Sequence, residues 1–206
     1  MNSASKIWVQ VIAALHLLKT DPAGLKGAVF RIRAGPVRDR LSREIQKLGT
    51  SVTRLHPNMS DEQLFGGIDV VTTLQSGNLK MTKGLFEQQG WFELVMAERC
   101  SLHLAARISQ ALDQRQIFPL IVFDEGIDEE KPPYSLQERL AFSFDMSELT
   151  YSDACYLDID IPSEKTQRIK IKQKDIQTLV LLAAEFGISS ARVPQFALAT
   201  AKANAM

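Results

Sequence analysis

Short apolar segments and amphipathic segments alternate along the chain as far as residue 123, and this alternation leaves few folds open. Residues 27–33 predict a strand, and residues 37–48 predict a helix with Leu41, Ile45 and Leu48 on one face. Strands separated by helices of about ten residues are typical of a parallel sheet that helices cover on both faces. The sequence therefore predicts an α/β fold built of three layers.

The same periodicities give the other expected elements. Helices are expected at residues 5–19, 69–74 and 102–112, and strands at residues 51–56, 91–97 and 118–123. Two further helical patterns, at 174–187 and 193–205, follow each other without a strand between them. We therefore expect an α/β domain over residues 1–145 and a small helical region over residues 146–206 that packs against it.

Composition argues against several classes of function. The 24 basic and 24 acidic residues cancel, which disfavours a generally basic nucleic-acid binder. Cys100 and Cys155 do not have the spacing of a zinc site, so we expect two reduced thiols and no metal centre. His16, His56 and His103 stand at unrelated spacings and are expected to be surface or loop residues. Because no run reaches about 18 apolar residues, we expect a cytoplasmic protein without a membrane span.

The turn between the first strand and its helix stands where a P-loop would bind phosphate. A working P-loop supplies glycine N–H groups, a lysine for the β- and γ-phosphates and a hydroxyl for Mg²⁺. This turn has Gly35, but Pro36 removes an N–H donor and Val37 adds bulk. Arg38 stands at the lysine position and Asp39 at the hydroxyl position. These residues favour a structural joint over a phosphate site.

Carboxylates at the end of a central strand are the second requirement of a nucleotide hydrolase. The strand at 91–97 carries Val95 and Met96 there, and these side chains cannot coordinate Mg²⁺. Glu98 is expected to be a solvated carboxylate in the first turn of the next helix. Asp124 and Glu125 are expected to be solvated acids of a surface loop, with no basic partner that would make them an acid/base pair.

Six segments spread over nearly the whole chain are recognisable together. They are AGPVRDR, LFGGIDVVTTLQSG, KGLFEQQGWFELVMAERC, FDEGIDEE, LQERLAFSFD and FGISSARVP. With these motifs the chain resembles the amino-terminal AAA+ domain of the D-type subunits of magnesium chelatase, the non-hydrolysing partners of the I-type ATPase subunit in (bacterio)chlorophyll biosynthesis. The resemblance implies a P-loop-type AAA+ domain with a parallel sheet, followed by a small helical lid.

The resemblance also implies roles for individual residues. It makes residues 35–39 a degenerate Walker A motif, and it places apolar side chains at the Walker B and first sensor positions, namely Val95, Met96 and Ile127. Arg139 matches the arginine finger, which acts on a neighbouring subunit, and Arg192 matches the second sensor arginine. This implies no catalytic residue in cis and no firmly bound cofactor, with ATP and Mg²⁺ at the site of the neighbouring I-type subunit. It further implies the I-type subunit as the ring partner and the large H-type subunit as an indirect partner.

The chain departs from the family pattern in two places. The hairpin expected before residue 117 is missing from the sequence, which puts the contact made by that hairpin in doubt. The acidic linker and the von Willebrand A-type domain of the family are also not in this sequence.

Two other functions stay open at this point. One is a divergent active ATPase in which Arg38 replaces the lysine, although Val95 and Met96 count against it. The other is a clamp-loader-like module that binds nucleic acid through the five arginines between residues 31 and 43, although the zero net charge counts against it.

Overall fold

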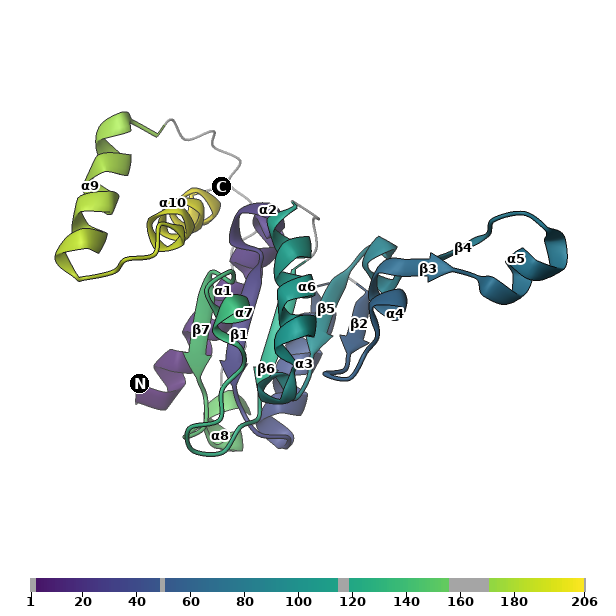
Figure 1. Ribbon diagram of the computed structural model, residues 1–206. Helices are drawn as coiled ribbons and strands as arrows, with labels where there is room; N and C mark the ends of the chain where they lie inside the picture. Colours follow the sequence, from purple (N-terminus) through teal and green to yellow (C-terminus); the bar gives the residue numbers. More distant parts are fainter. Residues whose placement is uncertain (1–2, 49–50, 115–118, 156–170, 206) are drawn as a thin grey trace.

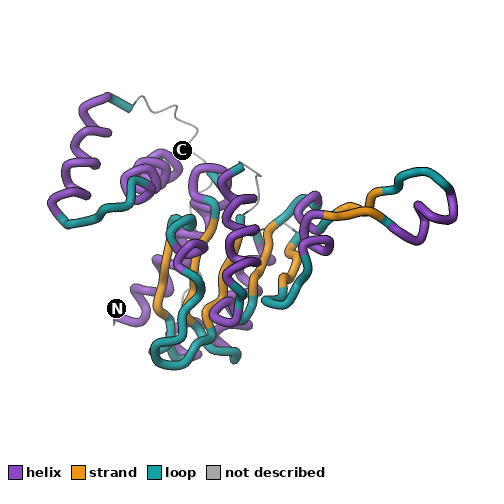
Figure 2. Tube along the Cα trace, viewed as in Figure 1, coloured by secondary structure: helices purple, strands orange, loops and turns teal. Residues whose placement is uncertain are grey.

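A five-stranded parallel sheet forms the centre of the molecule (Figures 1 and 2). The computed structural model describes residues 3–48, 51–114, 119–155 and 171–205. The five strands are β1 Gly27–Arg31, β2 Val52–Leu55, β5 Trp91–Leu94, β6 Leu120–Asp124 and β7 Phe142–Asp145. Their order across the sheet is β2-β5-β6-β1-β7, and every neighbouring pair is parallel.

Helices cover both faces of this sheet. Ala28 and Phe30 of β1 pack into one core, whereas Val29 packs into a second, because successive side chains of a strand point to opposite faces. The first core is completed by α1 (Ser3–Thr20), α3 (Pro36–Lys47) and α8 (Tyr151–Cys155), and the second by α4 (Asp61–Phe65), α6 (Leu102–Asp113) and α7 (Tyr134–Gln137). The prediction of a three-layer α/β fold is confirmed.

A narrow arm extends from the body beside α4 (Figure 1). It consists of β3 (Gly66–Ile68), α5 (Val70–Ser76) and β4 (Met81–Lys83), and β3 pairs antiparallel with β4. The helix expected at residues 69–74 is thus present, but it lies in the arm and does not cover the sheet. At the base, a Cβ on Gly84 would lie 2.3 Å from the carbonyl oxygen of Leu64, so only glycine fits there.

Two helices follow at the carboxyl end, α9 (Gln173–Glu185) and α10 (Arg192–Asn204). α10 packs against α1 and α2 (Pro22–Leu25), where Ala203 is buried in the first core. Met146, Leu149 and Ala154 are buried in the same core. This burial packs residues 146–154 against the α/β body. The expected boundary between an α/β domain ending at residue 145 and a helical region starting at residue 146 stays a prediction.

Three further observations bear on the sequence predictions. Within the described residues, no helix combines the length and the apolar character that a bilayer crossing needs. Burial raises the pKa of the Cys100 thiol to about 11, so it stays protonated at neutral pH. The prediction for Cys155 concerns a side chain outside the described part of the chain. The prediction of a missing hairpin concerns residues 115–118, which also lie outside it.

Candidate functional site

The turn after β1 leads into α3, and the residues of this turn are suited to begin a helix. Gly35 caps the helix with a φ of +157°, a conformation that favours glycine, and this residue has no side chain that could accept a hydrogen bond from the first turn. Pro36 occupies the first helical position, where a missing N–H costs little. Asp39 lies in the first turn, where a negative charge stabilises the helix dipole. The carboxylate of Asp39 therefore lies close to the helix start at which a phosphate would bind.

Arg38 is bound to a carboxylate of the same chain. Its Nη1 atom forms an ion pair with Oε1 of Glu125, which directly follows β6, the strand beside β1. The guanidinium also lies over the ring of Phe123, 5.5 Å from its centroid. Both partners of the ion pair are largely buried. The cation at the lysine position thus binds a carboxylate of its own chain. In a working P-loop this cation would bind phosphate.

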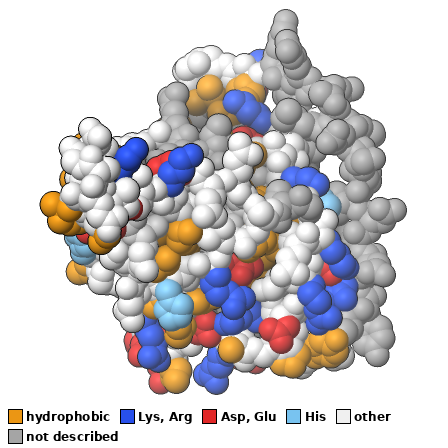
Figure 3. Space-filling model, turned by 90° about the vertical axis from the view of Figure 1, so that its right-hand side faces the viewer, with side chains coloured by type: hydrophobic (Ala, Val, Ile, Leu, Met, Phe, Trp, Pro, Cys, Tyr) orange, Lys and Arg blue, Asp and Glu red, His pale blue; other side chains and the backbone are white. Residues whose placement is uncertain are grey.

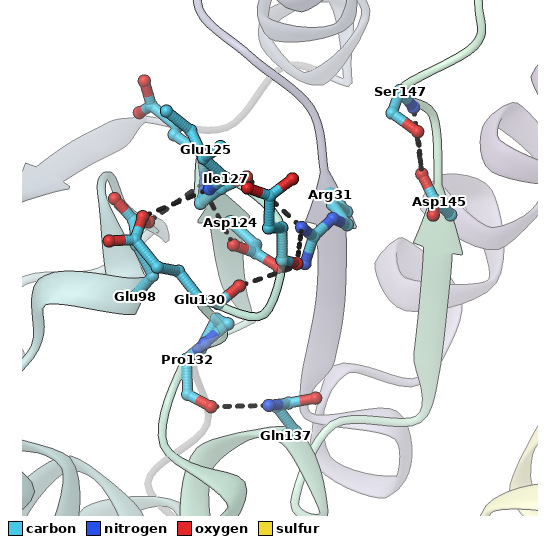
Figure 4. A network of polar contacts seen from close by, with 12 residues as sticks. Arg31, Glu98, Asp124, Glu125, Ile127, Glu130, Pro132, Gln137, Asp145 and Ser147 are labelled. Carbon is cyan, nitrogen blue, oxygen red and sulfur yellow. Dashed lines mark hydrogen bonds and ion pairs between the residues drawn. The ribbon is translucent and has the colours of Figure 1, made fainter.

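Glu125 and Glu98 belong to one polar network (Figure 4). Oε1 of Glu125 accepts the N–H of Met96 at 3.3 Å, and Oε2 of Glu98 accepts the N–H of Glu125 at 3.0 Å. The Glu98 side chain is only 3% exposed. The expectation of a solvated Glu98 is wrong, because residues 97–99 form the short 3₁₀ turn η2 and α6 begins only at Leu102.

Asp124 is likewise buried, with 4% of its surface exposed, so the expectation of a solvated loop acid is wrong. Strand β6 continues to this residue, and Asp124 pairs in register with Arg31 of β1. Nη1 of Arg31 donates to its Oδ2 atom at 3.1 Å (Figure 4). Arg31 also donates to the carbonyls of residues 126, 128 and 130. Both acids thus have a basic partner, and Arg31 fixes the loop after β6.

The positions matched to the Walker B acids and the first sensor offer no polar side chain. Val95 is buried, Met96 adopts a left-handed conformation with a φ of +49°, and Ile127 is exposed. Over the described ranges, no three His, Cys, Asp or Glu side chains gather in a way that could hold a metal ion. The residues present around this turn therefore do not fit a bound Mg²⁺–nucleotide.

Sequence reasoning overlooked Glu93, which lies within β5 and is 3% exposed. Burial is the largest effect on its carboxyl and raises the pKa, against the opposing charges of Arg54 and Arg38. The nearest atom of Arg54 is Nη2, at 3.7 Å. One charged residue inside the apolar segment WFELV is the signal that could have indicated a buried carboxylate.

Four of the five arginines between residues 31 and 43 bind other groups of the chain, whereas Arg33 is exposed. Arg31 binds Asp124, Arg38 binds Glu125, Arg40 binds Glu44, and Arg43 donates to the carbonyl of Asp39. On the face seen in Figure 3, basic and acidic side chains lie interspersed. Three of the five positive charges are thus opposed by carboxylates, which weakens the case for binding a nucleic-acid backbone.

Arg139 and Arg192 meet at a single carboxylate, that of Asp113 at the end of α6. Arg139 approaches Oδ2 of Asp113 with Nε at 2.9 Å and Nη2 at 2.8 Å. Nη1 of Arg139 donates to the carbonyl of Ser135 and to Glu138. Nη2 of Arg192 lies 3.3 Å from both oxygens of Asp113. The structure therefore brings the predicted arginine finger and the predicted second sensor arginine together.

The third cation at this carboxylate is Lys26, with Nζ 3.6 Å from Oδ1 of Asp113. Burial alone would raise the pKa of Asp113, but the hydrogen bond from Arg139 and the three positive charges outweigh it and lower the pKa. We call Lys26, Asp113, Glu138, Arg139 and Arg192 the Asp113 cluster.

The Asp113 cluster and the turn at residues 35–39 lie at opposite edges of the sheet. Lys26 directly precedes β1, whereas Gly35 follows its end. The five residues of β1, at about 3.3 Å each, separate the two edges by roughly 16 Å. Arg192 is thus not brought to the turn of its own chain.

The fold and the sequence are each similar to known proteins. No family model matches the chain. A presumed ATPase from Cytophaga hutchinsonii, known from a crystal structure, superposes with a TM-score of 0.61 over 97% of this chain and 79% of its own, at 12% identity. That likeness shows a shared three-layer α/β fold.

The sequence is 38% identical over 204 residues, 96% of the chain, to the magnesium-chelatase 60 kDa subunit of Cereibacter sphaeroides. It is 36% identical over 198 residues, 92% of the chain, to the subunit of that name from Rhodobacter capsulatus. The 67 kDa subunit of Chlorobaculum parvum is 30% identical over 122 residues, which are 58% of this chain and 19% of that subunit. The chain spans about a third of the two 60 kDa relatives, 36% and 35% of their respective lengths, so the similarity concerns one portion of magnesium-chelatase subunits.

Proposed function

We propose that this chain is a catalytically silent AAA+ module of a magnesium chelatase. It assembles with the I-type ATPase subunit, presents arginines to the ATP of that neighbour, and supports ATP-driven insertion of Mg²⁺ into protoporphyrin IX, with the H-type subunit as an indirect partner. The names of its relatives support the chelatase assignment.

The turn at residues 35–39 supports the silent status. Phosphoryl transfer depends on a cation at the β- and γ-phosphates, on bound Mg²⁺ and on an oriented water. In this chain the cation of Arg38 is paired with Glu125, and Val95 and Met96 stand where the metal-binding acids would be.

The observation that carries the proposal is the separation of the arginine pair from this turn. Arg139 and Arg192 share Asp113 at the edge of the sheet where β1 begins, whereas the turn follows the other end of β1. An arginine acts on a phosphoryl group only in direct contact with it. Both arginines therefore serve a nucleotide that another subunit binds.

Exposed apolar side chains on the arm support an assembly of several subunits. Residues of β3, α5, β4 and the adjoining loop are largely solvent-exposed, among them Ile68, Val70, Val71, Leu74, Leu79 and Met81. Exposed apolar side chains gathered on one short segment are typical of sites of protein–protein contact.

The experiment that tests this function mixes the chain with the I-type subunit of a magnesium chelatase and follows the complex by analytical ultracentrifugation. We expect a complex that Mg·ATP strengthens, because the arginines contact the neighbour's phosphates. Association that is indifferent to nucleotide, or no association, contradicts the proposal.

A further inference from the structure

The Asp113 cluster holds more positive than negative charge. Lys26, Arg139 and Arg192 oppose the carboxylates of Asp113 and Glu138, which leaves one positive charge in excess. The cluster joins four parts of the chain, since its members come from the residue before β1, the end of α6, the segment after α7 and the start of α10.

Helix α10 adds to this positive potential. It begins at Arg192, and its N-cap, Ala191, makes no side-chain hydrogen bond to the first turn. The N–H groups at a helix start carry a partial positive charge that favours anions. The charge excess and the helix start therefore act in the same direction.

Open space lies beside the cluster. A cavity of about 610 Å³ separates α7 from α10, and its wall includes Glu138 and Ser190. Glu138 is the second carboxylate on Arg139, and Oγ of Ser190 accepts the backbone N–H of Arg192 at 3.3 Å. The side chains of Asp113 and Arg192 are themselves 39% and 31% exposed, so an anion can reach the cluster from solvent.

The donors of Arg139 show what such an anion must displace. A guanidinium has five N–H groups. One on Nε and one on Nη2 point to Asp113, and two on Nη1 serve Ser135 and Glu138. Among the residues that the structure describes, one N–H remains without an acceptor, whereas bidentate binding of a phosphate needs two. The anion must therefore displace a carboxylate, and Asp113 is the carboxylate whose displacement frees Lys26, Arg139 and Arg192 together.

We propose that Lys26, Arg139 and Arg192 form one binding site for a polyphosphate oxyanion, and that the Asp113 carboxylate occupies this site until the anion displaces it. The proposal deepens the proposed function and rests on it where the anion is taken to be the terminal phosphates of the neighbour's nucleotide. It adds Lys26 as a third phosphate-binding cation and makes Asp113 the competitor of the phosphate.

The test uses the 206-residue chain and tripolyphosphate as the probe, with binding measured by isothermal titration calorimetry at low salt. Asp113→Asn keeps the shape of the side chain and removes the competing charge, so it should bind the probe about tenfold or more tightly than the wild type. The matched control is Asp61→Asn, since Asp61 and Asp113 are both 39% exposed and each lies 2.8 Å from an arginine nitrogen. The control should bind as the wild type does.

Loss of a cation should have the opposite effect. Lys26→Gln should weaken binding of the probe several-fold in either background, and Asp113→Asn combined with Arg139→Ala should abolish the gain. Unchanged or weaker binding by Asp113→Asn, or a gain that survives Arg139→Ala, overturns the site. If Asp113→Asn does not fold, Glu138→Gln replaces it, with a smaller gain expected because Glu138 opposes Arg139 alone.

A second arm identifies the source of the phosphate. In complex with the I-type subunit, Asp113→Asn should lower the ATP concentration that half-saturates hydrolysis, and Asp61→Asn should not. If the probe binds as expected while no cluster variant changes hydrolysis by the I-type subunit, the site takes free polyphosphate and the proposed function fails. If hydrolysis depends on Arg139 while the probe does not bind, the proposed function stands and the displacement of Asp113 is wrong.

Discussion

At the scale of single residues, the positive charge of Arg38 in the turn after β1 is neutralised by Glu125 of the same chain. Arg38 and Glu125 replace a lysine–phosphate contact with an internal ion pair, and Glu98 and Met96 hold Glu125 in place. The sequence predicted the loss of phosphate and metal ligands at this turn. It did not predict the pairing, because Arg38 and Glu125 are 87 positions apart in the chain and meet only when β1 and β6 align.

Restoring the P-loop residues should not restore hydrolysis. We expect the triple variant Val37→Gly, Arg38→Lys, Asp39→Ser to release phosphate from ATP no faster than the wild-type chain, which itself should show only background. Val95 and Met96 would still leave Mg²⁺ without ligands. A phosphate-release assay with a folded triple variant checks this, and measured turnover would refute the account of the silent turn.

Arg139 should contribute to the stability of the fold as well as to function. An exposed ion pair is worth little, but this side chain is 17% exposed and binds two carboxylates and a carbonyl. Arg139→Ala should therefore lower the free energy of unfolding by about 1–3 kcal/mol. Urea unfolding of the isolated chain measures this, and a loss equal to that of an exposed alanine substitution would show that the ion pairs carry no energy.

At the scale of elements, periodicity located four of the five sheet strands, the long helices and α5. It did not locate β7, the two strands of the arm or η2. Strands β3 and β4 have three residues each, too few to show an alternation of two. The turn η2 depends on the left-handed conformation of Met96, and no residue type in this segment predicts that conformation. The burial of Glu98 and Asp124 was also not predicted from the sequence, because tertiary contacts bury these two carboxylates.

The arm should tolerate polar substitution without loss of fold stability. Leu74→Ser and Leu79→Ser change exposed side chains, so the free energy of unfolding should stay within about 0.5 kcal/mol of the wild type. Leu64→Ala, at the buried base of the arm, should cost about 2–5 kcal/mol. Thermal or urea unfolding separates the two cases, and equal losses would place the arm's leucines in a packed core.

Glu93 gives β5 a pH dependence of known sign. Its pKa is raised in the folded chain, so its contribution to stability is present below the ordinary carboxyl pKa and is lost as the pH rises through the folded pKa. Glu93→Gln should therefore stabilise the chain more at pH 7 than at pH 4. Urea unfolding at both pH values, variant against wild type, checks the sign, and the reverse order would mean that the pairing with Arg54 dominates.

At the scale of the whole molecule, the two edges of one sheet carry two different kinds of site. The edge at which β1 ends presents a turn closed by its own ion pairs, and the edge at which β1 begins presents the Asp113 cluster. The family resemblance indicated Arg139 and Arg192 separately. Their meeting at Asp113, with Lys26, depends on the packing of α7 on α6 and of α10 on α2, and it could not be predicted from residues so distant in the sequence.

The proposed function requires that this chain does not hydrolyse ATP itself and that it acts on a neighbour's ATP through Arg139. The most direct measurement is the rate of ATP hydrolysis by the I-type subunit in complex with the wild-type chain, Arg139→Ala, Arg139→Lys and the control Arg107→Ala. Arg107 lies in α6 and, like Arg139, is paired with an aspartate at 2.8 Å.

Arg139→Ala should remove most of the rate gained at the shared interface, where an arginine finger is worth roughly 10³ to 10⁵. Arg139→Lys should rescue poorly, because a point charge does not bridge two phosphate oxygens. The complex with Arg107→Ala should hydrolyse ATP as the wild-type complex does. Wild-type turnover by an Arg139→Ala complex that ultracentrifugation shows to be intact would contradict the account and leave the chain a scaffold.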